Sequence, residues 1–228
     1  MQQQGFDYSY DKRLYDRHRH SDADAIRAHL RASLDYQDRL ARFLENHDEP
    51  RAAAVFRWPR HQAAAIVTAL APGSRFFHQG QFEGARVRVP THLRRGPVEP
   101  RNADVAAFYD RLLSVLRSDG FRDGAWSLIP PQPAWDGNPT DKDFVSFAWQ
   151  TRDGGGYVVA VNYSDHQGQC RLRLPFAGLA GRKVRFVDMM GSEVYDRDGT
   201  GLVEPGLFID LGAWRYNVFR LESVEQGI

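Results

Sequence analysis

The first half of the chain alternates short apolar runs with longer segments in which apolar residues recur every three or four positions. Three runs have the length and composition of short strands: residues 6–10, 40–45 and 74–77. A segment with helical spacing follows each run: from the cap pair Ser21-Asp22 through Leu34, from Pro59 to Gly73, and about 103–118. Strand and helix alternate three times, which predicts βα units on a parallel sheet or barrel.

The pattern changes after Asp119-Gly120, where only strand-like runs follow, separated by turn residues such as Asp153 to Gly156 and Pro205-Gly206. The runs are Phe144–Trp149, Tyr157–Val161, Cys170–Leu174, Val184–Val187, Leu207–Ile209 and Tyr216–Phe219. Short strands at such spacing predict an antiparallel β-sandwich. We therefore expect two domains, 1–120 and 121–228.

The composition restricts the classes of partner. With 42% hydrophobic and 26% charged residues, the 228-residue chain can build a core, and its net charge of +1 gives no basis for expecting nucleic acid or an acidic membrane as a partner. No segment approaches the ~18 apolar residues of a membrane span. The single cysteine, Cys170, excludes an intrachain disulfide and a thiol-rich metal site. Residues 1–5 lack the apolar core of a signal peptide, so a cytoplasmic location is the default expectation.

Candidate chemistry follows the second predicted strand, where Asn46-His47-Asp48 comes directly after an apolar run and Arg51 lies just beyond. Side chains at the carboxyl ends of barrel strands point into the active site. An imidazole and a carboxylate there can hydrogen-bond adjacent sugar hydroxyls, and the carboxylate favours the positive charge of an oxocarbenium-like transition state. The alternative is structural, with Asp48 capping a turn that Pro50 begins.

Four of these residues match a motif. Phe43, Asn46, His47 and Asp48 fit the Phe-x-x-Asn-His-Asp pattern that the α-amylase family of glycoside hydrolases and transglycosylases carries at its seventh barrel strand. Further on, residues 76–84 resemble the aromatic and glycine-rich segment that follows the family's eighth strand. An arginine- and proline-rich loop, a last helix and a sandwich then follow in the family's order. The resemblance covers essentially the whole chain.

The resemblance implies a partial (β/α)8 TIM barrel, its last three βα units, followed by an antiparallel β-sandwich. It implies an α-glucan or maltooligosaccharide substrate. Asp48 would be the carboxylate that stabilises the transition state, His47 would bind sugar hydroxyls, and Arg51 would hold the Asp48 loop and line the substrate site. Gln79 and Glu83 are expected to shape a turn. The family's calcium-binding insertion has no counterpart in this sequence, so we expect no metal and no cofactor.

The sequence also departs from the family pattern. A retaining glycosidase needs a nucleophile and an acid, and the segments that carry them in the family have no match here. Gly5-Phe6-Asp7 lacks the arginine of the nucleophile segment and is better interpreted as the strand after the acid, so neither Asp7 nor Asp11 is expected to be a nucleophile. We expect the chain to be inactive alone.

Two other functions stay open. The chain could be a non-catalytic α-glucan-binding module, which needs exposed aromatics in a row on one sheet face; the candidates are Trp126, Trp135, Trp149 and Trp214. It could also be one half of a two-chain glycosidase whose partner supplies the other strands, because three βα units leave strand edges unpaired. That hypothesis predicts self-association through residues 1–100.

One further motif, Arg17-His18-Arg19-His20, is interpreted as exposed charge before a helix.

Overall fold

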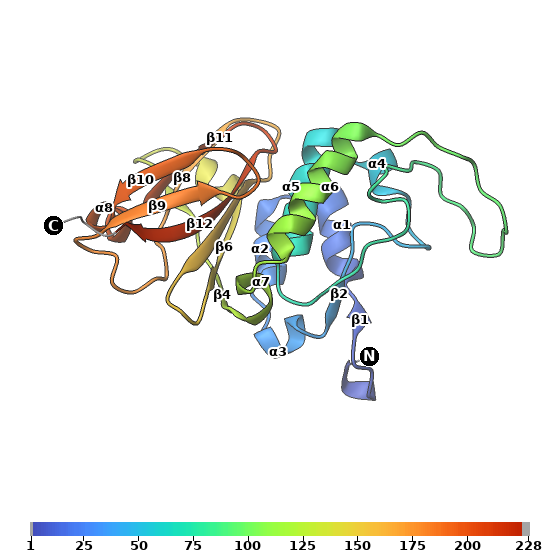
Figure 1. Cartoon of the computed structure of the whole chain (residues 1–228), viewed down its shortest axis with the longest axis horizontal. Helices are drawn as coiled ribbons and strands as arrows, with labels where there is room; N and C mark the ends of the chain where they lie inside the picture. Colours follow the sequence, from blue (N-terminus) through green and yellow to red (C-terminus); the bar gives the residue numbers. More distant parts are fainter. Residues whose placement is uncertain (1, 225–228) are drawn as a thin grey trace. The chain divides into compact units, whose positions relative to one another are not determined.

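The computed structural model describes residues 2–224 (Figure 1). It divides into two compact units, Met1–Ser114 and Val115–Ile228. Each unit is built from a different kind of sheet, parallel in the first and antiparallel in the second. Among the described residues, none of the helices is long and apolar enough to span a membrane.

The first unit contains a small parallel sheet in the order β1 (Ser9–Tyr10), β2 (Leu40–Arg42), β3 (Ser74–Arg75). Ser9 pairs with Leu40, and Ala41 pairs with Ser74. Parallel neighbours need a crossover between them, and helices supply it here. The sequence therefore predicted the three strands and their parallel arrangement, although each is shorter than its apolar run.

The crossovers and the segment after β3 contain six helices. Their bounds are α1 Lys12–His20, α2 Ala23–Leu30, α3 Leu34–Gln37, α4 Ala52–Val55, α5 Trp58–Leu70 and α6 Ala103–Leu116, with a 3₁₀ turn at Gln2–Gln4. Asp22 caps α2 as predicted, and its carboxylate accepts the Ala25 N–H at 3.0 Å. The predicted continuation to Leu34 was wrong, because the chain leaves the helix and begins α3 from Ser33.

The interpretation of residues 17–20 as exposed charge was also wrong, because they form the last turn of α1. Leu14, Tyr15 and His18 lie on the buried face of this helix, and His18 follows the other two by about one helical turn. His18 is fully buried, and its Nε2 lies 3.1 Å from the Thr68 hydroxyl. Burial lowers the pKa of His18 to about 3, so the ring is neutral at pH 7. The polar flanking residues concealed this face in the sequence.

A buried polar cluster joins α1 to the sheet. Asp11 caps α1 by accepting the Leu14 N–H at 3.1 Å, and the Arg42 guanidinium of β2 and His29 Nε2 also contact its carboxylate. Arg42 donates to the Pro72 carbonyl at 2.8 Å. Burial by itself would raise the pKa of Asp11, but the His29 hydrogen bond and the Arg42 charge hold it below its ordinary value. Asp11 thus has a structural task.

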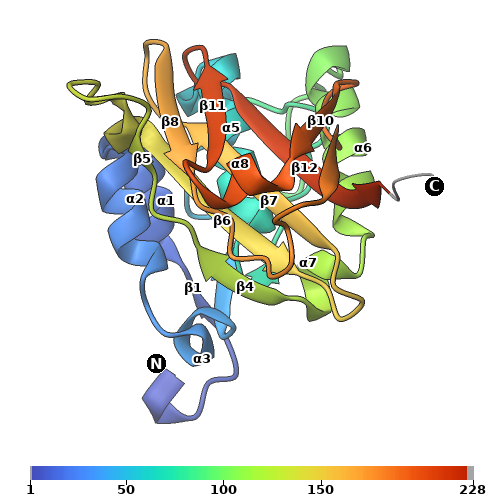
Figure 2. The same ribbon diagram turned by 90° about the vertical axis from the view of Figure 1, so that its left-hand side faces the viewer.

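The second unit is a β-sandwich with two antiparallel sheets, ordered β10-β9-β12-β7-β6-β4 and β11-β8-β5 (Figure 2). The strands are β4 Ala125–Leu128, β5 Gln132–Pro133, β6 Phe144–Gln150, β7 Gly156–Asn162, β8 Gly168–Leu172, β9 Lys183–Asp188, β10 Val194–Asp198, β11 Leu207–Leu211 and β12 Tyr216–Val224. Short helical segments are α7 Gly120–Asp123, η2 Thr140–Asp143 and α8 Gly199–Val203. All six strands expected from the sequence are present.

The sandwich core brings together alternate residues from both sheets. Val158 of β7 and Phe219 of β12 come from the larger sheet, and Cys170 of β8 and Ile209 of β11 from the smaller one. Strands β8 and β11 are buried on one face and show this alternation, whereas β7 is buried along its whole length and has a continuous apolar run. The sequence did not predict β4, β5 and β10, because they are short or, like β10, carry mostly polar residues.

Candidate functional site

The loop after β2 is shaped by Asn46. Its side-chain oxygen accepts the backbone N–H groups of Asp48 and Glu49, each at 2.9 Å, which fixes a tight turn. The turn leaves the His47 side chain 43% exposed and the Asp48 side chain 71% exposed, with His47 Nε2 3.3 Å from Asp48 Oδ2. The predicted imidazole and carboxylate therefore lie together, facing solvent, after the central parallel strand.

Arg51 is buried beneath this turn. It forms an ion pair with Glu45, with 3.0 Å between Nη2 and Oε1, and donates to the Gln79 carbonyl at 2.8 Å. Its Nη1 also contacts His78 Nδ1. Gly80 has a φ of +87°, and a Cβ at that position would strike the Arg51 guanidinium. Arg51 thus joins the loop after β2 to the loop after β3, which fits the loop-holding role expected of it.

Glu45 is a buried charged residue of this site that the sequence analysis did not identify. It is 1% exposed, its Oε2 accepts the Ala52 N–H at 2.6 Å, and its Oε1 lies at ion-pair distance from Arg51 without hydrogen-bond geometry. Burial outweighs the Ala52 hydrogen bond and the Arg51 charge and raises the pKa of Glu45 to about 7. The signal that could have identified Glu45 is a carboxylate directly after the apolar pair Phe43-Leu44.

A long segment between β3 and α6, residues 85–101, braces the same loop (Figure 1). Arg88 Nε donates to the His47 carbonyl at 3.2 Å, and the Arg86 guanidinium donates to the Ala53 carbonyl. Glu99 closes the segment by accepting the N–H groups of Arg86 at 2.8 Å and Val87 at 3.1 Å. The backbone around His47 is therefore held from both sides.

Gln79 and Glu83 contribute their backbone to this arrangement. The Gln79 carbonyl accepts from Arg51, and the Glu83 carbonyl accepts the Asn102 N–H at 2.9 Å. Both side chains are exposed. Because these contacts involve only the backbone, the turn-shaping role of the two residues stays a prediction.

Tyr10 lies at the end of β1 and packs edge-on against two aromatic rings, Phe43 at 5.4 Å and Phe76 at 5.7 Å between centroids. It remains 48% exposed. The ends of the three strands therefore carry an aromatic group besides the imidazole and the carboxylate. Among the described residues, no group of three or more His, Cys, Asp or Glu side chains could hold a metal ion.

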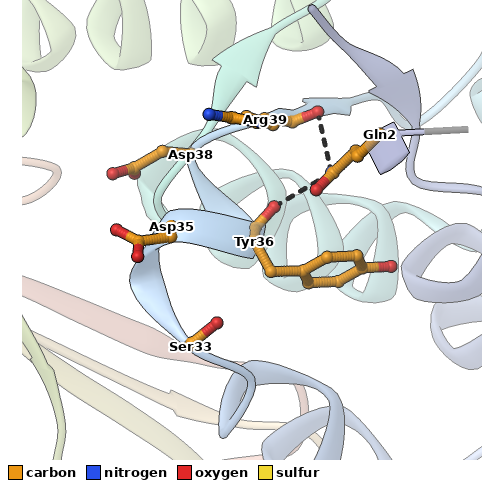
Figure 3. A pocket seen from close by; sticks show the side chains of 6 residues that line it. All are labelled: Gln2, Ser33, Asp35, Tyr36, Asp38 and Arg39. Carbon is orange, nitrogen blue, oxygen red and sulfur yellow. Dashed lines mark hydrogen bonds between the residues drawn. The ribbon is translucent and has the colours of Figure 1, made fainter. Parts of the chain in front are cut away.

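A separate cavity of about 550 Å³ lies at the opposite end of the sheet (Figure 3). It is lined by Gln2, Ser33, Asp35, Tyr36, Asp38 and Arg39. Gln2 donates to the carbonyls of Tyr36 at 3.1 Å and Arg39 at 3.2 Å, which ties the first turn to the segment before β2. Because active sites of parallel sheets form at the carboxyl ends of the strands, this cavity is the less favourable position for one.

The fold can be compared with known proteins. No protein-family model matches the chain, and no curated protein matches it either. A search of solved structures finds a maltogenic α-amylase from Thermotoga neapolitana (TM-score 0.74, 16% identity), covering 96% of this chain and 51% of that one. An Anoxybacillus α-amylase is also similar (TM-score 0.71, 15% identity), and the match covers 99% of this chain and 49% of that one. The Geobacillus thermoleovorans α-amylase, complexed with acarbose, gives a TM-score of 0.69 at 16% identity. That match covers 93% of this chain and 47% of that one.

The chain spans about half the length of these structures, and the mixed α/β fold with its antiparallel sheets matches the C-terminal part of α-amylases. At such identities the likeness concerns the fold. The resemblance to α-amylase-family glycoside hydrolases, inferred from the Asn46-His47-Asp48 motif, is confirmed at that level.

Proposed function

We propose that the chain is the C-terminal part of an α-amylase-family enzyme that acts on α-glucosidic bonds as a retaining hydrolase or a transglycosylase. In this proposal the first unit supplies the last three βα units of a (β/α)8 barrel. The carrying observation is that Asn46, His47 and Asp48 follow the central parallel strand in a chain with an α-amylase-like fold. This is where barrel enzymes place reacting groups.

Each site residue then has a chemical task. The exposed carboxylate of Asp48 stabilises the positive charge that develops on the sugar ring. His47 donates to or accepts from ring hydroxyls beside it. Arg51 holds the loop through Glu45 and Gln79; substrate contact by Arg51 would require its buried guanidinium to become accessible. The nucleophile and general acid are to be sought outside the 228 residues.

The substrate class proposed is an α-glucan or maltooligosaccharide. Its support is that the similar structures include a maltogenic amylase and two enzymes studied with acarbose, from Geobacillus thermoleovorans and Nostoc punctiforme. An exposed imidazole and carboxylate 3.3 Å apart suit two neighbouring hydroxyls of a pyranose ring.

Two assays test the proposal. We expect no reducing-sugar release from maltooligosaccharides or trehalose by the purified chain. Turnover that Asp48→Ala abolishes would reveal a nucleophile and an acid within the chain and contradict the account.

Acarbose should shift the His47 imidazole NMR signals, and Asp48→Ala should weaken that binding. His166→Ala removes a similarly exposed, carboxylate-paired imidazole in the second unit and serves as the matched control. Binding unaffected by Asp48→Ala would place the sugar elsewhere.

A second candidate is one half of a two-chain glycosidase. It is supported by the open edges of the parallel sheet, since β1 and β3 each pair only with β2 among the described strands. Phe6, Tyr8 and Tyr10 beside the β1 edge are 59%, 58% and 48% exposed. The partner would be the missing barrel strands or, without them, a second copy. Monodisperse monomers in solution would count heavily against it.

The glucan-binding module has weaker support. Of the four tryptophans considered, Trp135 is 56% exposed, Trp149 is buried, and Trp126 and Trp214 are half-buried. The other strongly exposed aromatic ring described in the second unit, Phe208, has the Arg171 guanidinium 5.4 Å from its centroid. Trp135 and Phe208 are thus the strongly exposed aromatic rings among the described residues of the second unit, and they give a longer row of stacking rings no support. Retention of the chain on immobilised amylose, lost in Trp135→Ala, would restore this alternative.

A further inference from the structure

His78 follows β3 and is held through both its backbone and its ring. Its backbone N–H donates to Gln81 Oε1 at 3.2 Å, and its ring nitrogen Nδ1 accepts a hydrogen bond from the Arg51 guanidinium. The His78 side chain is 28% exposed. The imidazole is therefore a fixed, partly accessible group at the carboxyl end of a parallel strand, where barrel enzymes place substrate-binding side chains.

The contact with Arg51 determines which ring nitrogen of His78 carries the hydrogen. A guanidinium group has only donors, so Nδ1 must accept. Glu45 Oε1 lies 3.7 Å from Nδ1, which is too long for a hydrogen bond, and this oxygen has no hydrogen-bond partner among the described residues. Burial and the charges of Arg51 and His47 lower the pKa of His78, so the ring is neutral at pH 7. A neutral imidazole with an accepting Nδ1 carries its hydrogen on Nε2.

The Nε2–H group of His78 is available to a ligand. Among the described residues Nε2 has no hydrogen-bond partner, and it is not one of the unpaired polar atoms that are shut off from solvent. Nδ1, by contrast, faces the guanidinium of Arg51, which is buried. The accessible edge of the ring therefore carries a donor whose direction is set from the buried edge.

Aromatic rings extend from His78 across the ends of the strands. The His78 ring stacks on Phe76, with 6.4 Å between centroids and 21° between planes, and Phe76 packs edge-on against Tyr10 at 5.7 Å. Tyr10 is 48% exposed, and Phe76 is half-buried. We name Tyr10, Phe76 and His78 the aromatic floor, because they are continuous and partly accessible.

The aromatic floor is connected to the candidate sugar ligands. Arg51 contacts His78 and follows His47 and Asp48 in the same loop. The charge of His47 acts on the ring of His78, where it helps to lower the pKa, so the two imidazoles lie within range of each other's field. Both imidazoles come directly after neighbouring parallel strands, β2 and β3.

We propose that His78 is a further substrate-binding residue, whose Nε2–H donates to an oxygen of the sugar held by His47 and Asp48. Tyr10 and Phe76 then pack against the apolar face of the adjoining sugar unit, as aromatic side chains do in ligand sites. The inference rests on the proposed function and adds a specificity-determining donor to the same site. A donor that is already fixed in direction costs little ordering on binding, and a sugar without an oxygen at that place binds more weakly.

Two substitutions at His78 separate sugar binding from loop support. His78→Asn places an amide oxygen where Nδ1 lies, so it can still accept from Arg51, but it removes the Nε2 donor. His78→Gln places an amide nitrogen near Nε2 and removes the acceptor for Arg51. In NMR titrations of the full chain with acarbose, we expect His78→Asn to weaken binding by about tenfold, the loss of one hydrogen bond, and His78→Gln to retain most of the affinity. His20→Asn, at an exposed histidine that ends α1, is the matched control and should bind like the unsubstituted chain.

The order of the two variants distinguishes the roles. If His78 only supported the loop, His78→Asn would bind acarbose better than His78→Gln, because it keeps the contact with Arg51, and that order would overturn the proposal. Acarbose binding that Asp48→Ala weakens and folded His78→Asn leaves unchanged would overturn it too, while the proposed function stands.

The chemical shifts of the imidazole nitrogens give a readout that needs no sugar. We expect a protonated Nε2 and an unprotonated Nδ1 at His78; a hydrogen on Nδ1 would overturn the proposal by itself. If acarbose does not bind the unsubstituted chain, the proposed function fails, and this inference fails with it.

Discussion

Charged side chains in the interior of the first unit hold the carboxyl ends of the strands in place. Asp11 and Arg42 join α1 to β2, and Glu45 and Arg51 join the two loops beyond the sheet. Such pairs gain little net stability over apolar substitutes, but removing one partner leaves a costly buried charge. Their effect is to fix geometry, which a loop carrying His47 and Asp48 needs.

The raised pKa of Glu45 predicts a pH-dependent stability. The folded state keeps this proton until about pH 7, whereas the unfolded state releases it near the ordinary value of 4.5. The stabilisation is thus full below 4.5 and is lost as pH rises towards 7, by about 1.4 kcal/mol per pH unit. Glu45→Gln has no such proton, so its stability relative to the unsubstituted chain should rise across this window in urea unfolding. If the unfolding free energies of the two proteins changed with pH in parallel, the raised pKa of Glu45 would be contradicted.

Arg42→Met should destabilise the first unit by about 3–5 kcal/mol, because it removes the guanidinium that pairs with Asp11 and leaves that carboxylate buried without it. Arg42→Lys keeps the charge without the planar fork and should cost less. Hydrogen exchange checks the prediction: α1 and β2 should lose protection, while β6 and β7 serve as the internal control. Unchanged protection of α1 would show that the pair is dispensable.

At the scale of elements, Asn162 illustrates how the sandwich is closed. It is fully buried at the end of β7, and its amide nitrogen donates to the carbonyls of His166 at 2.7 Å, Leu211 at 2.9 Å and Gly212 at 3.1 Å. One side chain thereby ties a strand of the larger sheet to the end of β11 in the smaller one. Backbone groups at that corner would otherwise lack partners.

Asn162→Ala should therefore cost about 1–3 kcal/mol of unfolding free energy. Asn162→Asp preserves the shape but replaces the donor with an anionic oxygen facing carbonyls, so it should cost more. Asn217→Ala, which removes a single bond to Asp188, provides the milder comparison. Thermal unfolding of the three variants gives the ranking, and an aspartate variant as stable as the unsubstituted chain would refute the donor role.

The elements themselves were predictable to different degrees. In the sandwich, β6 and β7 are buried along almost their whole length, and their runs of apolar and β-branched residues mark them in the sequence. In the first unit, α5 was apparent from Pro59 and its apolar run. Helix α1 was not, because its buried face consists of Leu14, Tyr15 and a histidine among charged residues. Periodicity measures apolar residues and does not detect a buried imidazole.

At the scale of the whole molecule, the open parallel sheet predicts self-association. Strand edges with exposed aromatic residues beside them are sites for pairing with another chain. Sedimentation should show concentration-dependent oligomers, and replacing Phe6 and Tyr8 together by lysine should reduce them. Trp135→Lys, an exposed aromatic of the second unit, is the control and should have no effect. Oligomers that persist in the double variant would move the interface elsewhere.

The sequence by itself determined the three parallel strands, helices α5 and α6, six strands of the sandwich, the change from α/β to all-β character, and the Asn46-His47-Asp48 motif. These features depend on local pattern and on residues adjacent in the chain. The tertiary structure decided which charges are buried. Glu45 and Arg51, like His61 and Tyr109, meet only when loops and helices distant in sequence pack together. Burial and pairing of this kind have no local signature, so the support beneath the motif appears only in the folded chain.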